Sequence, residues 1–478
     1  MAATGTIPQP GLTAVRPTAS RGARLPHAWP IYALFLGFPV WWILGLGSFI
    51  WPIMAVPMGF SLLARERIRL PRGFGLYLLF VLWMLASALQ INGPDRMIGF
   101  AFRALLYTSA GITCLYVYNA PKRLLPTHTL VRVMAIFWVI VVAGGLLGIM
   151  APTLEFATVM ERLIPRRLLA NDFVATLVHP TTAQIQTFLG YEVPRPRAPF
   201  VYTNDWGGNY ALLVPFLVAA WSQIRSLARR NLVRLLAVVS LLPVVFSLNR
   251  MLWLCLVVTA IYASLRFAMR GRKGGVQGVL AFAAVFIMVL SFGPTRQLID
   301  DRIATPHSNQ GRSILYKEAA DSVQKSPLLG YGGPRPSQSN PNLPSVGTQG
   351  QFWLVLFSHG IPGALLFVSF FAYACFRTRK VKSPMALWCH VVVVLALVQM
   401  PFYGLLPSQL NIIMIAIDIA SREELDPEPE VTFVERATPR RDDVVVAAAP
   451  VTNGRARPLN PSNGTGSSHD DGSHGSPV

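Results

Sequence analysis

The sequence predicts an all-α integral membrane protein with about 12 transmembrane helices, two long extracytoplasmic loops and disordered cytoplasmic termini. The first supporting observation is the composition: 53% of the 478 residues are hydrophobic, only 13% are charged, and the mean hydropathy is +0.45. Soluble domains carry about 25% charged residues. The second is that apolar windows long enough to cross a bilayer recur through most of the chain. The third is that basic residues gather in the short segments between these windows.

The predicted spans are windows of mostly apolar residues separated by turns or charged segments. They cover residues 31–46, 49–64, 74–91, 97–118, 130–150, 207–222, 232–248, 250–268, 276–293, 351–375, 383–402 and 405–421. We expect a tail at 1–28, a polytopic membrane domain at 29–422 and a second tail at 423–478, because both tails lack the apolar residues that a folded core needs. The connections at about 151–206 and 294–350 are long, and long loops commonly carry function.

The basic residues predict how the chain is oriented in the membrane. The formal net charge is +20, and basic clusters lie at 65–72, 122–123, 225–234, 266–273 and 377–382. Because short cytoplasmic loops are enriched in Lys and Arg, these clusters and both termini are expected in the cytoplasm, with both long loops on the outer face. This distribution favours membrane loops over a nucleic-acid surface, so we expect no nucleic-acid partner.

The cysteines do not indicate a metal site or a disulfide framework. The chain has four, Cys114, Cys255, Cys375 and Cys389, and each lies inside an apolar stretch. A free thiol in that setting behaves as a small buried hydrophobic group, and no zinc-like spacing is present. We therefore expect neither a metal nor a cofactor.

Arginines near the predicted outer face are the first functional candidates, since ionisable groups at membrane depth are costly to maintain. Arg197 precedes the sixth span, Arg250 lies in a very short turn, and Arg312 lies in the second long loop. Arg103 is embedded in the fourth span. Guanidinium groups stay charged and offer paired N–H donors to phosphate oxygens, which suits a diphosphate leaving group. The alternative is that arginines near helix ends extend to lipid headgroups, which fits Arg250 least because its turn is so short.

Three sequence motifs carry a more specific signal. Arg195-Pro-Arg-Ala-Pro-Phe-Val-Tyr-Thr-Asn204 precedes the sixth span, Ser326-Pro-Leu-Leu-Gly-Tyr-Gly-Gly333 lies in the second long loop, and Gly360-Ile-Pro-Gly363 lies near the start of the tenth span. Together with the turn at Arg250, they resemble the O-antigen ligase and Wzy-type polymerase superfamily of bacterial membrane proteins. The resemblance covers roughly residues 30–420 and leaves out both tails.

The resemblance implies an inverting, metal-independent, GT-C-like membrane glycosyltransferase. Such an enzyme transfers a glycan from a polyprenyl-diphosphate-linked donor to a saccharide or a lipid-glycan acceptor at the outer face of the plasma membrane. The implied partners are therefore this donor, a glycan or glycolipid acceptor, and membrane lipids. In this scheme arginines hold the diphosphate, and stabilisation of the leaving group is the largest contribution of the site.

The chain departs from the family pattern at one position. Counted back from Gly363, Gln349 stands where many members carry a catalytic His. A neutral amide does not accept a proton at neutral pH, so the base lies elsewhere or the site works by positioning alone. The other candidates for the base are Asp205, Glu192, Glu318 and His307. His359 is interpreted as a hydrogen-bonding packing residue.

These considerations give two sets of candidate site residues. The candidate catalytic residues are Arg197, Arg250, Arg312, Gln349, Asp205 and Glu192. The candidate substrate-binding residues are Arg103, Arg195, Asn204, Tyr316 and Trp353.

Two other classes of function stay open on the sequence alone. A transporter or flippase of lipid-linked saccharides fits a chain of about twelve helices, although such proteins show internal symmetry and polar or broken helices near the bilayer middle. A scaffold for a cell-wall complex would act through its tails. Deletion of the residues after about 423 would then abolish function, whereas the enzyme would largely retain it.

Overall fold

The computed structural model describes residues 28–186, 191–271 and 307–425, together with positions 277, 278, 280, 283, 284 and 287. The tails at 1–27 and 426–478 and most of the predicted span 276–293 lie outside these residues. The described residues belong to one compact unit, Met1–Pro427, whereas the second unit, Glu428–Val478, lies outside them. The side chain of His307 also falls outside the described set.

Residues 28–150 form a series of helices and one 3-10 turn. These are α1 (Trp29–Phe35), α2 (Phe38–Ile43), α3 (Ile50–Leu63), α4 (Phe74–Ala86), η1 (Ser87–Gln90), α5 (Pro94–Asn119) and α6 (Thr127–Met150). The window 31–46 is thus two short helices, with Pro39 at the start of the second. Proline has no N–H to continue a preceding helix but is favoured in a first turn, which explains the break.

The connection after α6 is folded rather than extended. It contains α7 (Val159–Leu163), α8 (Arg166–Leu169), α9 (Asp172–Val178), β1 (Ala183–Gln186) and β2 (Val193–Pro196). The strands pair antiparallel, with Ala183 opposite Pro196 and Gln186 opposite Val193. The expectation of an all-α chain is therefore wrong here. Gly148 lets α6 and β2 pack closely. A Cβ at this position would clash, since it would lie 2.6 Å from the carbonyl oxygen of Thr182 and 2.9 Å from Cα of Pro196.

The remaining helices follow in two groups, one on each side of the undescribed segment. They are α10 (Thr203–Trp221), α11 (Leu227–Val239), α12 (Leu241–Phe246), α13 (Arg250–Ala268), α16 (His307–Lys325), α17 (Gln351–Thr378), α18 (Pro384–Gln399) and α19 (Ser408–Leu425). The window 232–248 is divided between α11 and α12, because Pro243 cannot donate to the carbonyl of Val239.

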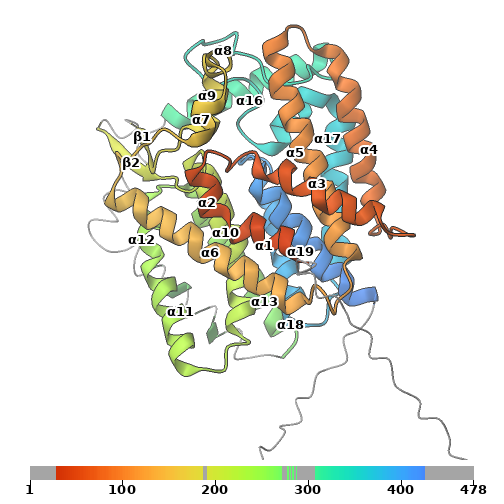
Figure 1. Cartoon of the computed structure of the whole chain (residues 1–478), viewed down its shortest axis with the longest axis vertical. Helices are drawn as coiled ribbons and strands as arrows, with labels where there is room; N and C mark the ends of the chain where they lie inside the picture. The colour runs from red at the N-terminus through yellow and green to blue at the C-terminus, as the bar shows by residue number, and fades with distance from the viewer. Residues whose placement is uncertain are drawn as a thin grey trace, which may run out of the picture. The chain divides into compact units, whose positions relative to one another are not determined.

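Four of these helices are long and apolar enough to cross a membrane, namely Arg96–Asn119, Thr127–Met150, Arg250–Ala268 and Gln351–Thr378. Shorter apolar helices cover Ile50–Leu63, Phe74–Gln90 and Pro384–Gln399. The protein is therefore a helical membrane protein, and the count of about twelve spans stays a prediction. Figure 1 shows α19 among the other helices, where it packs against α5, α10, α17 and α18. Its apolar residues face all directions, as expected of a helix buried on every side.

A break in α17 explains the glycine-rich motif of residues 326–333. Gly360 has φ 70° and ψ −173°, which lies outside the helical region and is accessible essentially only to glycine. The motif binds the backbone at this break. Tyr331 N–H donates to the carbonyl of Phe357 at 3.0 Å, and Ile361 N–H donates to the carbonyl of Pro327 at 2.7 Å. The motif therefore fixes the N-terminal part of α17, which begins at Gln351, two residues after Gln349.

Candidate functional site

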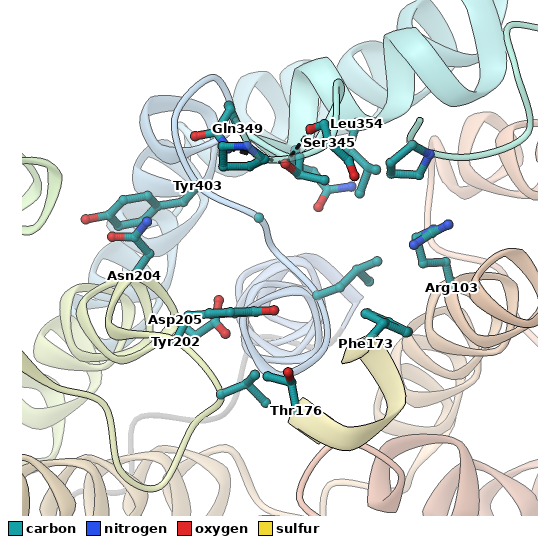
Figure 2. A pocket seen from close by; sticks show the side chains of 18 of the residues that line it. Arg103, Phe173, Thr176, Tyr202, Asn204, Asp205, Ser345, Gln349, Leu354 and Tyr403 are labelled. Atoms are coloured by element: carbon teal, nitrogen blue, oxygen red, sulfur yellow. Dashed lines mark hydrogen bonds between the residues drawn. The ribbon is translucent and has the colours of Figure 1, made fainter. Parts of the chain in front are cut away.

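A cavity of about 1260 Å³ opens among the ends of several helices. Its wall combines α5, α9, both strands, the N-terminal turns of α10, α13 and α16, and the segments before α17 and α19. Figure 2 shows Arg103 on one side of the cavity, and Asp205 with Tyr202 on another. This size suits a ligand larger than a simple sugar, because typical small-molecule pockets measure about 300–1,000 Å³.

The cavity wall is strongly basic. Among the described residues that line it, the arginines are Arg96, Arg103, Arg195, Arg250 and Arg312, and the carboxylates are only Asp172 and Asp205. Five guanidinium groups against two carboxylates favour an anionic ligand. The arginines come from α5, β2, α13 and α16, so the fold brings together cations that are far apart in the sequence.

Arg195 is held firmly at the cavity wall. Its side chain is 7% exposed, its Nε donates to the carbonyl of Ser247 at 2.6 Å, and its Nη1 donates to Gln186 Oε1 at 2.6 Å. The acceptor on Ser247 belongs to the turn that leads into α13. Arg195 therefore joins β2 to the turn that carries Arg250.

Arg250 occupies the first residue of α13, after a tightly constrained turn. Leu248 has a positive φ of 48°, which is uncommon for a residue with a branched side chain. Asn249 caps the helix, because its Oδ1 accepts the N–H of Leu252 at 3.3 Å. The Asn249 Nδ2 donates to the carbonyl of Thr203 at 3.5 Å, at the start of α10. The turn therefore sets the position of Arg250 relative to α10.

Arg197 does not lie in this cavity, contrary to the expectation that it shares one with Arg250 and Arg312. Its Nε donates to the carbonyl of Thr181 at 3.3 Å, and its Nη1 donates to the carbonyl of Val201 at 2.9 Å. Burial lowers its pKa from the usual value. Arg197 lines a small adjoining space of about 30 Å³ and stabilises the loop before α10. The geometry assigns the cavity position to Arg195 instead.

Asp205 lies in the first turn of α10, ahead of the predicted span 207–222, and lines both the cavity and the small adjoining space. Its side chain is partly exposed. Desolvation by the surrounding protein raises its pKa to about 7, although a backbone hydrogen bond at Tyr202 opposes the change. No described cation lies within ion-pair distance of its carboxylate. The group therefore exchanges a proton near neutral pH.

Comparison with known families connects this geometry to a class of protein. Residues 200–368 match the O-antigen ligase family. This segment contains Asp205, Arg250, Arg312 and Gln349 and supplies half of the residues that line the cavity, whereas Arg103 and Arg195 lie before it. No curated protein matches the chain. The family match confirms the resemblance that the sequence motifs indicated.

Within the O-antigen ligase segment, Gln349 and Asn204 line the cavity, whereas Tyr316 and Trp353 do not. The rings of Tyr316 and Trp353 stack with centroids 4.5 Å apart, and the Tyr316 hydroxyl donates to the carbonyl of Gln349 at 3.2 Å. The two aromatic residues therefore support the backbone that carries Gln349, and direct contact of either with substrate stays a prediction.

Three of the other base candidates also lie away from the cavity or outside the described side chains. Glu192 is exposed and does not line the cavity, and its role in the site stays a prediction. Glu318 accepts hydrogen bonds from Ser337 Oγ at 2.7 Å and from Gln338 N–H at 2.6 Å. His307 cannot be placed because its side chain is not described.

His359 is buried at the break in α17, and its Nδ1 lies 2.7 Å from Ser87 Oγ. This contact confirms that His359 is a hydrogen-bonding packing residue. Among residues 28–186, 191–271 and 307–425, no group of three or more His, Cys, Asp or Glu side chains is arranged to hold a metal ion. The absence of a cofactor stays a prediction.

Several wall residues were not identified from the sequence. Arg96 lines the cavity, and its Nη2 donates to the carbonyls of Tyr331 at 2.6 Å and Gly333 at 3.1 Å. It lies seven residues before Arg103 on α5, and this spacing puts both arginines on one helix face. The spacing could therefore have indicated Arg96 from the sequence. Tyr202 and Tyr403 also line the cavity, but nothing in their spacing distinguishes them from other tyrosines.

Proposed function

We propose that the chain is an inverting, metal-independent glycosyltransferase that transfers a glycan from a polyprenyl-diphosphate donor to a saccharide or lipid-glycan acceptor. The reaction takes place at the outer face of a bacterial plasma membrane. The observation that carries the proposal is the arginine-rich cavity, half of whose lining residues belong to the O-antigen ligase segment. The family match supports a lipid-linked glycan as the class of substrate.

The arginines supply the electrostatic part of the reaction. Charge develops on the diphosphate as the bond to the anomeric carbon breaks, and fixed donors at this position lower the barrier. Arg195, Arg250 and Arg312 come from three different elements and line one cavity. Several guanidinium groups around one diphosphate also supply the positive charge that a divalent cation provides in other enzymes.

The cavity also suits the hydrocarbon part of the donor. On α5, Phe102 and Leu106 line the cavity together with Arg103. A wall that combines apolar and cationic side chains matches a molecule in which a diphosphate is attached to an isoprenoid chain. Inversion follows if the acceptor hydroxyl displaces the diphosphate in one step from the opposite side of the sugar.

The proposal is tested with purified protein in lipid vesicles that contain a polyprenyl-diphosphate glycan and an acceptor glycan. We expect release of polyprenyl diphosphate and a product with inverted anomeric configuration, both measurable by mass spectrometry and NMR. R250A and R312A should each lose activity, whereas R167A is the matched control, because Arg167 is exposed on α8 and does not line the cavity. Unchanged turnover in both cavity variants would reject the proposal. Donor translocation without donor consumption would instead support the flippase alternative.

A further inference from the structure

An acceptor hydroxyl becomes a good nucleophile when a nearby group removes its proton. Gln349, at the position where the resemblance leads one to expect a His, cannot do so. Among the described residues that line the cavity there is no His, Lys or Cys, and the carboxylates are Asp172 and Asp205. The choice of a proton acceptor in this part of the wall is therefore between two aspartates.

The two aspartates differ in their surroundings. Asp172 is an exposed residue in the first turn of α9, a helix of only seven residues. Asp205 is partly enclosed in the first turn of α10, and Figure 2 shows it beside Tyr202 at the edge of the open space of the cavity. A catalytic carboxylate needs to be shielded from bulk water and held in one place. Asp205 meets this condition better.

Hydrogen bonds join the backbone around Asp205 to the segments that carry the arginines. The Thr203 hydroxyl donates to the carbonyl of Arg195 at 3.3 Å, and Asn249 Nδ2 donates to the carbonyl of Thr203. The start of α10, the end of β2 and the turn before Arg250 therefore form one hydrogen-bonded unit. This arrangement fixes a carboxylate at a set position relative to the cations that would hold the leaving group.

We propose that Asp205 is the general base that activates the acceptor hydroxyl. Asp205 accepts the hydroxyl proton on a carboxylate oxygen while the acceptor oxygen forms a bond to the anomeric carbon. The bond from that carbon to the diphosphate oxygen breaks, and the leaving polyprenyl diphosphate keeps the electron pair. This inference rests on the proposed function. The raised pKa of Asp205, about 7, supports it, since a base is most effective when its pKa lies near the working pH.

Other titratable or charged groups share the two spaces that Asp205 lines, and the pH dependence must be separated from theirs. They are Tyr202 before α10, Arg195 on β2, Arg197 after β2, Arg250 on α13, Arg312 on α16, Arg96 and Arg103 on α5, Asp172 on α9, His179 after α9 and Tyr403 before α19. Of these, His179 is the one imidazole; it lines only the smaller space, where its Nδ1 lies 3.0 Å from Glu161 Oε2. A His179 variant is therefore a necessary control.

The test compares D205N with D172N and H179Q, all in the full-length protein reconstituted in lipid. For D205N we expect kcat to fall about 10²- to 10⁴-fold, the usual contribution of a general base, while the donor KM changes little. The wild-type rate should rise with pH up to about 7 and then level off, and this step should be absent in D205N. D172N and H179Q should keep the pH step. Added formate or azide should partly restore D205A, because a small anion can replace the missing carboxylate.

The outcomes separate this inference from the proposed function. If D205N keeps the wild-type rate and pH profile while R250A is inactive, Asp205 is not the base but the transferase proposal stands. If R250A and R312A are also fully active, the transferase proposal fails together with the inference. If D205N fails to fold, D205A with and without formate provides the measurement, and no restoration in a folded D205A protein would overturn the inference.

Discussion

Replacement of Arg250 by Ala should weaken the binding of the diphosphate. Arg250 stands at the first residue of α13, on the wall of the basic cavity, where the turn through Asn249 holds its backbone. Each hydrogen bond to a charged group contributes about 1.5–3 kcal/mol. A tenfold change in Kd corresponds to about 1.4 kcal/mol. Loss of one such bond should therefore weaken diphosphate binding about 10- to 150-fold.

The assay is calorimetric titration of the reconstituted protein with a short-chain isoprenyl diphosphate. R250K keeps the charge but loses the paired donors, so its Kd should lie between those of the wild type and R250A. The corresponding monophosphate should lose less affinity in R250A than the diphosphate does, since it offers fewer oxygens. R167A should bind as the wild type. Equal diphosphate affinity of R250A and the wild type, with both proteins folded, would show that Arg250 does not bind the diphosphate.

Three further predictions follow from the same geometry. R195A should weaken donor binding about tenfold or more, as measured by titration. R197A should keep the wild-type affinity and lower only the melting temperature, as measured by thermal unfolding. G360A should destabilise the fold by more than about 2 kcal/mol, measured by unfolding in detergent, because a Cβ there has a strained φ and meets the carbonyl oxygen of Leu328. The folded-state pKa of Asp205 is about 7, above the ordinary value of 3.8. The contribution of this carboxyl group to the stability of the fold is therefore fully present below about pH 4 and is lost as the pH rises through 7. D205N should therefore raise the melting temperature more at pH 8 than at pH 4, and an equal change at both values would contradict this sign.

Much of the helical architecture was predictable because bilayer-length apolar windows are a strong signal. The windows 97–118, 130–150 and 351–375 each coincide with one long helix. The hairpin of β1 and β2 was missed for a physical reason. Its strands have four residues each, and β2 contains Pro194 and Pro196, which cannot donate to a strand ladder and so weaken any strand signal.

Part of the candidate site was also predictable from the sequence. Arg250 and Arg312 line the cavity as expected. They could be selected from the sequence because ionisable residues at membrane depth are costly to maintain. The distinction between Arg195 and Arg197 was not available from the sequence. Two residues that lie two apart on a continuous strand face the same side, but β2 ends at Pro196, and the N–H of Arg197 donates to the carbonyl of Thr182. The end of the strand therefore directs the two guanidinium groups to different spaces.

The arrangement of Tyr316 and Trp353 could not be predicted from the sequence. Aromatic residues near a membrane surface serve as sugar platforms, interfacial anchors or packing elements, and sequence alone does not separate these roles. Here the two rings stack on each other and support the backbone of Gln349. Their effect on activity should therefore act through the position of Gln349.

Binding of the diphosphate by the cavity arginines is tested most directly by a cryo-electron-microscopy structure of the protein in lipid with an isoprenyl diphosphate bound. We expect the diphosphate oxygens within hydrogen-bond distance of guanidinium groups of Arg195, Arg250 and Arg312, with the carboxylate of Asp205 facing the side from which the acceptor approaches. A diphosphate bound outside this cavity, or one bound in it without contact to any of the three arginines, would show that these arginines do not hold the leaving group.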